Sequence, residues 1–357
     1  MIKLSDIAER AGVSESTASR ALANSPRISA ETRELVQRLA QEAGYKVNQV
    51  ARNLRTRSTM TIGLVVPEVS NPYFPRLVQL IGDRARAAGF ALQLHLSGVR
   101  QEAEADCLAS LYEHRVDGIL LVTSESGLVA RTQVEAMVAS GESVVLLGWV
   151  EDADRFDLVY ANDAGGGYQV AKHLVDLGHR RIATLGSARH RGPFDRVEGF
   201  LRGLREAGIA DERHIPGRTL DEIEHAISRL CEETNPPTAL FAYQDSIAAL
   251  ACRFLRQRCV VIPEQISVAG FDNLDLGTYL CPQLTSVDFP MKEMANRAVE
   301  LLIERIKSVA LNEPWRHIVV EPELVIRESC TTPRSADSFQ LPPCPASSTK
   351  LSDGATE

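Results

Sequence analysis

The sequence lacks the marks of a membrane protein, a disulfide-bonded protein or a zinc protein. Its 357 residues include seven cysteines, an odd number, and no two of them stand at Cys-x-x-Cys spacing, so neither a disulfide framework nor a zinc site is indicated. No apolar run reaches the roughly 18 residues of a membrane span, and no basic segment followed by an apolar one opens the chain. We therefore expect a cytoplasmic protein that enters no membrane.

The motifs of common enzyme classes are also missing. Gly186 to Gly192 lacks the closing Gly-Lys-Ser/Thr of a phosphate-binding loop, Gly165 to Gly167 lacks dinucleotide-binding spacing, and no Gly-x-Ser-x-Gly elbow occurs. His173 and His179 are six residues apart and His190 stands among arginines, so we expect surface histidines rather than metal ligands. The sequence predicts no catalytic residues, no metal and no cofactor.

Positive charge is concentrated at one end of the chain. Residues 1–60 contain ten Lys and Arg against six Asp and Glu, a charge of +4, so the rest must carry −12 to give the overall −8. A basic end on an acidic protein can neutralise DNA phosphates while the larger part stays away from the polyanion. The alternative is an ordinary solvated basic face.

The first 45 residues predict three short helices. Ser5, Ser14 and Ser29 are suitable N-caps for them, and Gly44 fits the position that follows the third helix. A helix, a Gly-Val-Ser turn and a second helix form the helix-turn-helix pattern. We expect the second helix to enter the major groove of DNA.

From Thr61 onward, short β-rich runs alternate with helical stretches, which is typical of parallel sheets covered by helices. Residues 62–90, ending Arg-Ala-Ala-Gly-Phe, parallel residues 182–209, ending Arg-Glu-Ala-Gly-Ile. This repeat predicts two similar lobes rather than one long sheet. The expected strands are 62–66, 91–96, 119–122 and 144–147 in the first lobe, and 182–185, 239–242 and 267–270 in the second.

Ligands of open parallel sheets bind beyond the carboxyl ends of the strands, so the residues just after each strand would line a site between two lobes. These positions carry aromatic side chains, which can stack on a sugar or base, and planar polar groups, which can hydrogen-bond vicinal hydroxyls. Phe74 and Trp149 can alternatively be core residues. The candidates for effector binding are Asn71, Tyr73, Phe74, Trp149, Arg196, Gln244 and Asp272.

Several motifs occur in the order typical of one protein family. They include the string from Leu4 to Leu22, Asn71-Pro-Tyr-Phe74, Gly178-His-Arg-Arg-Ile182 and Ala269-Gly-Phe-Asp272. Over about residues 3 to 328 the chain resembles the lactose-repressor/galactose-repressor (LacI/GalR) family of bacterial transcription regulators. The surroundings of Phe74, Arg196 and Asp272 match effector-contact positions of that family. Trp149 aligns loosely, and Gln244 stands where many relatives carry Asn.

The resemblance implies a small all-α helix-turn-helix headpiece followed by an α/β domain of two lobes, similar to type I periplasmic binding proteins. The chain would cross between the lobes three times. The expected domains are residues 1–46 (headpiece), 47–60 (hinge helix and linker), 61–161 with 290–321 (first lobe), 162–289 with 322–330 (second lobe) and 331–357 (a disordered tail rich in Pro, Ser, Thr and Ala).

The expected DNA contacts lie on the second helix and in the hinge. Arg20 can grip a guanine, and Glu15 can accept a hydrogen bond from a cytosine. In relatives the residue equivalent to Leu54 wedges into the minor groove, whereas Val47 departs from the family, which has Pro there. The DNA-binding candidates are Ser5, Ser14, Glu15, Ser16, Thr17, Ser19, Arg20, Asn24, Asn48, Ala51, Leu54 and Arg55.

These features together predict a ligand-responsive repressor of a carbohydrate operon. One headpiece buries too little surface for high specificity, so we expect a homodimer on pseudopalindromic double-stranded operator DNA. Its small-molecule effector would be a sugar or sugar derivative that acts as an inducer. Two alternatives remain open: a corepressor-dependent regulator that responds to a purine or another metabolite, and a solute-binding receptor. Prolines after Cys330 exclude the C-terminal helix of tetrameric relatives.

Overall fold

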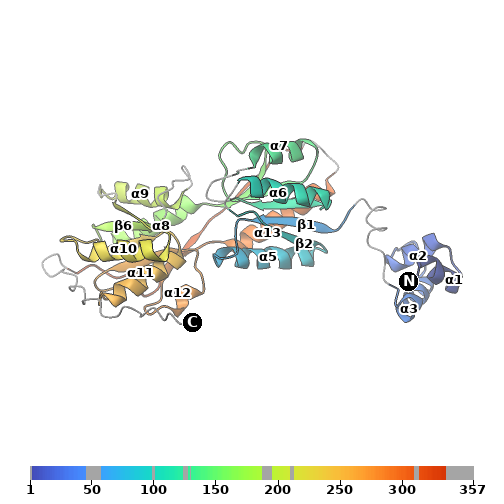
Figure 1. The fold of residues 1–357 in the computed structure, drawn as a ribbon, viewed down its shortest axis with the longest axis horizontal. Coiled ribbons are helices and arrows are strands. Elements are labelled where there is room, and N and C mark those ends of the chain that lie inside the picture. The colour runs from blue at the N-terminus through green and yellow to red at the C-terminus, as the bar shows by residue number, and fades with distance from the viewer. Residues whose placement is uncertain are drawn as a thin grey trace, which may run out of the picture. The chain divides into compact units, whose positions relative to one another are not determined.

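The computed structural model describes residues 2–45, 58–98, 101–123, 128, 130–186, 195–209, 213–308 and 313–334. The chain forms two compact units, Met1–Thr59 and Met60–Glu357 (Figure 1). The predicted hinge helix lies outside the described residues, and so do residues 335–357 of the tail predicted for 331–357. Thr331, at the start of that predicted tail, is ordered, and its backbone N donates to Ser267 Oγ over 3.1 Å. The described part of the first unit is helical, and the second unit holds two β-sheets.

The first unit is a bundle of three helices, α1 (Leu4–Arg10), α2 (Glu15–Leu22) and α3 (Ala30–Glu42), which confirms the predicted helix-turn-helix headpiece. Four of the six side chains in its core are alanines, so the helix backbones can approach one another closely. The core residues are Ile7, Ala8, Ala18, Ala21, Val36 and Ala40.

Serine caps begin two of these helices, as predicted. The backbone N of Thr17 donates to Ser14 Oγ over 3.2 Å, and that of Thr32 donates to Ser29 Oγ over 3.2 Å. Gly44 follows α3 at a φ of +63°, a left-handed conformation that glycine adopts without steric cost.

The predicted cap at Ser5 is wrong. Helix α1 begins two residues earlier than a cap at Ser5 implies, at Leu4, and its N-cap is Lys3. The Asp6 carboxylate accepts a hydrogen bond from the Lys3 backbone N over 2.9 Å. An acidic side chain in the first turn therefore stabilises this helix end, and Ser5 is a helical residue.

The first sheet of the second unit is parallel, with strand order β11-β5-β4-β3-β1-β2. Helices α5 and α13 cover the face that carries Leu64 and Leu120, and α6 and α7 cover the face of Val65 and Leu121. The elements are β1 (Thr61–Val66), α5 (Tyr73–Ala87), β2 (Ala91–Leu96), α6 (Gln101–Glu113), β3 (Gly118–Val122), α7 (Arg131–Ala139), β4 (Val144–Leu147), β5 (Asp157–Ala161), α13 (Met291–Lys307) and β11 (His317–Val320).

The second sheet has the order β12-β10-β9-β8-β6-β7, and β12 is its antiparallel strand. Two sheets of this kind confirm the predicted two-lobed α/β fold. The elements are α8 (Asp163–Asp176), β6 (Ile182–Gly186), α9 (Arg196–Glu206), β7 (Arg213–Pro216), α10 (Leu220–Cys231), β8 (Ala239–Ala242), α11 (Asp245–Gln257), β9 (Ser267–Phe271), α12 (Leu276–Tyr279), β10 (Thr285–Asp288) and β12 (Glu323–Val325).

The chain passes between the two sheets three times. It leaves the first sheet after Ala161, returns after Asp288, and leaves again after Val320. One apolar cluster extends from the α5 and α13 face of the first sheet into the second lobe, through Phe289 in the middle crossing. Within the described residues, no helix is both long and apolar enough to cross a membrane.

Among the described strands, the sequence pattern missed β5, β7, β10, β11 and β12, of which β7, β11 and β12 lie at sheet edges. β5 begins with Asp157, whose buried carboxylate accepts hydrogen bonds from Arg305 Nε (2.6 Å) and Nη2 (2.8 Å) on α13. β10 carries Thr285 and Ser286 at buried positions. Apolar runs in these strands are short or interrupted by polar residues, so the strand pattern in the sequence is weak.

The expectation of surface histidines is wrong for His179. Its ring is buried, with Nδ1 2.8 Å from Thr238 Oγ1 and Nε2 2.9 Å from the Thr331 carbonyl oxygen. Burial lowers the pKa of His179 to about 4, so the ring is neutral. The neutral imidazole therefore connects Thr331, at the end of the second lobe, to Thr238, which immediately precedes β8.

Candidate DNA-binding helix and effector-binding residues

Helix α2 presents a polar face to solvent and an alanine face to the core. Glu15, Ser16 and Arg20 are exposed, whereas Ala18 and Ala21 are buried against the other two helices. Ser16 and Arg20 are four residues apart and therefore lie on the same face of the helix. The arrangement leaves a guanidinium, a carboxylate and a hydroxyl available to a partner.

Other DNA-binding candidates of this unit also have roles in its fold. Ser14 Oγ caps α2 and lies 2.9 Å from both Ser16 Oγ and Thr17 Oγ1. Asn24, with a φ of 54°, accepts a hydrogen bond from Gln37 Nε2 over 2.7 Å and so joins the end of α2 to α3. Thr17, Ser19 and Ser5 are half-buried. The hinge candidates Asn48, Ala51, Leu54 and Arg55 lie outside the described residues.

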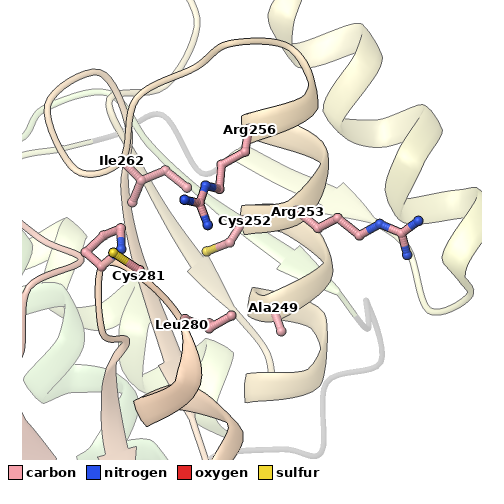
Figure 2. Close-up of a pocket in the computed structure, with 8 residues that line it drawn as sticks. Ala249, Cys252, Arg253, Arg256, Ile262, Leu280 and Cys281 are labelled. Atoms are coloured by element: carbon pink, nitrogen blue, oxygen red, sulfur yellow. The ribbon is translucent and has the colours of Figure 1, made fainter.

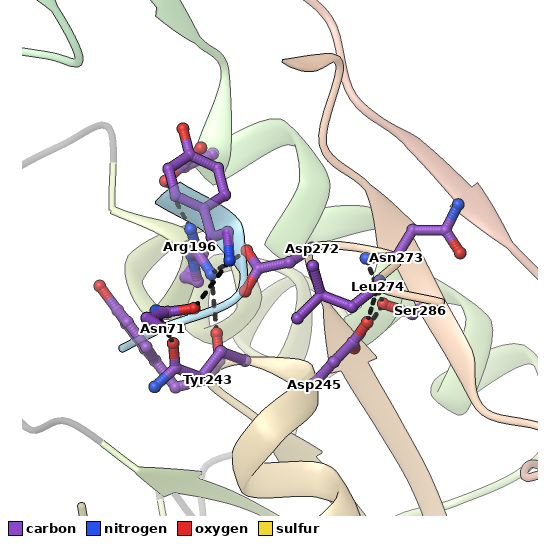
Figure 3. A network of polar contacts seen from close by, with 11 residues as sticks. Asn71, Arg196, Tyr243, Asp245, Asp272, Asn273, Leu274 and Ser286 are labelled. Carbon is purple, nitrogen blue, oxygen red and sulfur yellow. Dashed lines mark hydrogen bonds and ion pairs between the residues drawn. The ribbon is translucent and has the colours of Figure 1, made fainter. Parts of the chain in front are cut away.

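In the second unit, Arg196 is the centre of a buried polar network (Figure 3). Its Nη2 donates to Asp163 Oδ2 over 3.1 Å, and its Nη1 donates to Asp272 Oδ1 (3.2 Å) and to the Tyr243 carbonyl oxygen (2.8 Å). The guanidinium carbon lies 3.7 Å from the centroid of the Phe271 ring, a cation–π contact. Only 9% of Arg196 is exposed, so water screens these contacts weakly.

The charges of this network are strongly coupled. Although burial disfavours its charged form, the carboxylates of Asp163 and Asp272 hold the pKa of Arg196 above its ordinary value. Burial, together with the nearby charges of Asp245 and Asp163, raises the pKa of Asp272 to about 7 despite the opposing effect of Arg196. The site therefore combines a permanent cation with a carboxyl that titrates near neutral pH.

Close packing of two helices brings Asp163 to Arg196. A Cβ atom at Gly167 of α8 would lie 1.8 Å from the Arg196 carbonyl oxygen, and one at Gly199 of α9 would lie 1.8 Å from the Ala164 carbonyl oxygen. Glycine is thus required on both helices for their backbones to touch at the end where the network forms. Asp163 was not among the predicted effector residues. The glycines in the sequences of α8 and α9 could have indicated that these helices pack closely enough to bring Asp163 to Arg196.

Two of the predicted effector residues join the lobes directly. Asn71 follows β1 in the first lobe, Gln244 precedes α11 in the second, and Asn71 Nδ2 donates to Gln244 Oε1 over 3.1 Å (Figure 3). Asn71 Oδ1 accepts a hydrogen bond from the Tyr73 backbone N over 3.0 Å, which fixes the amide at the start of α5. Strand ends from both sheets therefore meet here, as the topology predicts.

The aromatic candidates divide into two groups. The Tyr73 ring packs edge-to-face against Phe74 (centroids 5.1 Å apart) and against Phe289 in the middle crossing (5.3 Å). Trp149 is half-buried and packs against the apolar cluster under α6 and α7. Tyr73 and Phe74 are likewise partly buried, against the apolar cluster that continues into the second lobe.

A pocket of about 310 Å³ lies elsewhere, on the second lobe (Figure 2). It is formed by α11 and the segment after α12, and it contains none of the predicted effector residues. Figure 2 shows the Arg253 side chain directed away from Cys252 and Ile262. The lining residues are Ala249, Cys252, Arg253, Arg256, Ile262, Leu280, Cys281 and Pro282.

Comparisons with known proteins agree with the two-part architecture. Residues 3–48 match the model of the bacterial regulatory proteins, lacI family, and residues 171–330 match that of a periplasmic binding protein-like domain. The chain is similar to the ribose operon repressor of Haemophilus influenzae, with 33% identity over 92% of this chain and 98% of that protein.

Two further matches extend over nearly the full chain. The HTH-type transcriptional repressor PurR of Vibrio atlanticus is 32% identical over 93% of this chain and 99% of its own length. A solved structure, the transcriptional regulator CelR-cellobiose complex, is 28% identical with a TM-score of 0.68, covering 92% of this chain and all of that one. The two relatives are named as repressors and the solved structure as a transcriptional regulator, none of them as an enzyme, and this protein is likewise a transcriptional regulator rather than an enzyme. The chain belongs to the LacI family of bacterial regulatory proteins.

Proposed function

We propose that this LacI-family regulator represses a carbohydrate-utilisation operon and is released from DNA by a sugar-type inducer. The observation that carries the proposal is the Arg196 network, because predicted effector residues from the strand ends of both lobes gather around it. An effector held there contacts both lobes and can change the angle between them. Such a protein acts on chromosomal DNA, so we propose a cytoplasmic location.

Operator recognition is proposed for α2 and the hinge. Arg20 can donate two hydrogen bonds to guanine O6 and N7, and Glu15 and Ser16 are exposed beside it. The hinge candidates would add contacts in the minor groove of a bent duplex. Two headpieces related by symmetry would read the two halves of a pseudopalindrome, so we propose a homodimer.

The charge of the network favours an uncharged effector. The Arg196 cation lies between the half-buried Asp163 at 3.1 Å and the buried Asp272 at 3.2 Å. A phosphate on the effector would therefore meet a cation already paired with Asp163 and with Asp272, whereas sugar hydroxyls can hydrogen-bond both carboxyl groups and accept from the guanidinium. Tyr73 and Phe74 add aromatic faces that suit the apolar side of a sugar ring. The CelR regulator, solved with cellobiose, and the ribose operon repressor point to the same class.

A purine or similar metabolite acting as a corepressor is the second candidate. The PurR relative is as similar to this chain as the ribose operon repressor is, and the rings of Tyr73 and Phe74 can also stack on a flat base. The two candidate effectors change operator affinity in opposite directions. An inducer binds the DNA-free state more tightly and weakens operator binding, whereas a corepressor strengthens it.

Fluorescence anisotropy on a labelled duplex from the chain's own promoter region tests both candidates. We expect tighter binding than to random DNA, and weakening by a neutral sugar from a panel that includes ribose and cellobiose, sugar phosphates and purines. Arg196→Met should abolish the response, and the control Arg202→Met, an exposed residue of the same helix, should retain it. Equal affinity for promoter and random DNA would contradict the repressor function. Strengthening by a purine alone would favour the corepressor.

A further inference from the structure

The turn that follows strand β9 has an unfavourable backbone conformation. Asp272 has a φ of 102° and Asn273 a φ of 45°, so two successive non-glycine residues adopt the left-handed region. This conformation is strained for residues other than glycine and persists only where the surroundings hold it. Since Asp272 is the network carboxylate that contacts Arg196, whatever holds this turn also places that carboxylate.

The turn is held from below by Asp245, the first residue of α11 (Figure 3). The Asp245 side chain is fully buried, accepts a hydrogen bond from the Leu274 backbone N over 2.7 Å, and accepts a second from Ser286 Oγ over 2.7 Å. The Asn273 backbone N donates to the same Ser286 oxygen over 3.1 Å. Asp245 therefore fixes two consecutive amides of the turn, one directly and one through Ser286.

The Asp245 carboxylate occupies space that is available only because residue 270 is a glycine. A Cβ atom at Gly270, in strand β9, would lie 2.2 Å from Asp245 Oδ1, so any side chain there would displace the carboxylate. The absence of a side chain at this position lets the carboxylate reach the turn beneath the strand end. Burying a carboxylate costs free energy. Its presence here is explained by the two hydrogen bonds that it accepts from the Leu274 amide and Ser286, which an apolar side chain could not accept.

The same turn faces the first lobe. Arg76, on helix α5, donates from Nη1 to the Asn273 carbonyl oxygen over 3.3 Å. The Asn273 side chain is held within the second lobe by Arg327 (2.5 Å) and by Asp288 (3.1 Å). A displacement of the turn therefore moves a group that the first lobe contacts.

We propose that Asp245 is a positioning residue of the effector site. It holds the 272–274 turn so that Asp272 faces Arg196 and the Asn273 carbonyl faces Arg76. Asp245 thereby links the binding of an effector beside Asp272 to the contact that the Asn273 carbonyl makes with the first lobe. The proposal rests on the proposed function for the identity of the site, but the placement of the turn can be measured without any effector.

Hydrogen–deuterium exchange of the full-length, effector-free protein tests this placement. Asp245→Asn keeps the side-chain volume but cannot offer two acceptor oxygens. Ser286→Ala removes the hydroxyl that bridges Asp245 to Asn273 and leaves the direct hydrogen bond between Asp245 and the Leu274 amide. We expect the Asn273 and Leu274 amides to exchange about tenfold faster in Asp245→Asn, and Asn273 alone in Ser286→Ala. Glu222→Gln, which alters a carboxylate that caps α10 in the same lobe, should leave both amides unchanged. Unchanged exchange at both amides in both variants, or equal acceleration throughout the lobe, would overturn the proposal.

A pH titration separates positioning from packing. Around Asp272 the charged and titratable groups are Arg196 on α9, Asp163 on α8, Tyr243 and Asp245, and Arg327 also faces Asp245. Removing the Asp245 charge should lower the pKa of Asp272, followed by NMR in protein labelled with ¹³C at the aspartate carboxyls, because a like charge held beside it is lost. An unmoved midpoint would mean that Asp245 does not set the surroundings of Asp272. Neither measurement requires DNA or effector, so a failure here is distinct from a failure of the repressor function.

Discussion

Arg196→Met is expected to destabilise the second unit by an amount that grows with pH. Arg196 is 9% exposed, and its guanidinium makes three hydrogen bonds, two of them to carboxylates. Removing one member of a buried ion pair costs about 3–5 kcal/mol when the remaining charge stays buried and ionised. Methionine keeps an apolar contact with the Phe271 ring, so the change mainly removes the charge.

The size of the loss depends on the protonation of Asp272. Its pKa is about 7 with Arg196 present, chiefly because of burial, and loss of the cation raises it further. A carboxyl whose folded pKa lies above its unfolded value of about 3.9 contributes stability at low pH, and this stability is lost as the pH rises through the folded pKa. Above about pH 7 the wild type has completed this loss. The variant continues to lose up to about 1.4 kcal/mol per pH unit.

Urea unfolding followed by circular dichroism, at about pH 6 and about pH 9, measures this difference. We expect a deficit of roughly 1–3 kcal/mol at the lower pH, from the lost hydrogen bonds, and about 2 kcal/mol more at the higher pH. Arg202→Met is the control, because Arg202 is exposed on the same helix with its guanidinium over the Tyr168 ring. A deficit that is the same at both pH values would refute the assignment of Asp272 as a carboxylate balanced by Arg196.

Four further outcomes follow from the headpiece, the hinge, the helix contact and the tail. Arg20→Ala should weaken operator binding by about 1–3 kcal/mol and binding to random DNA little, in a gel-shift assay. Leu54→Ala should reduce operator bending, measured by fluorescence energy transfer across the site, because its wedge in the minor groove is lost. Gly167→Ala should cost about 1–3 kcal/mol of unfolding free energy and weaken effector binding, since its Cβ would lie 1.8 Å from the Arg196 carbonyl oxygen. Deleting residues 334–357 should leave a dimer by light scattering.

Each of these outcomes has a result that contradicts it. Equal losses on operator and random DNA would mean that Arg20 touches only phosphate. If the Leu54→Ala variant bends the operator as much as the wild type does, Leu54 is not a minor-groove wedge. For the helix contact, Gly82→Ala in α5 is the control, because its Cβ would lie 3.5 Å from Leu92, an ordinary contact. A Gly167 variant as stable as this control would contradict the close approach. A tetramer that falls to a dimer on truncation would assign the tail an assembly role.

Features encoded in consecutive residues were predictable from the sequence. The caps at Ser14 and Ser29 need only a hydroxyl within three residues of a helix start, and both are present. Strands β1 and β3 are buried on both faces, so their apolar runs stand out, and the repeat of residues 62–90 in 182–209 indicated two lobes. The family motifs add the order of these parts along the chain.

Only the tertiary structure decided which side chains meet. Asp163, Arg196 and Asp272 come from two helices and a strand end, and they meet because glycine backbones let α8 and α9 touch. Asp245 shows the same limit, since its hydrogen bond to the Leu274 amide depends on a turn that is distant in sequence. Periodicity reports whether a residue faces inward, but partners are set by the packing of whole elements, which no short stretch of sequence contains.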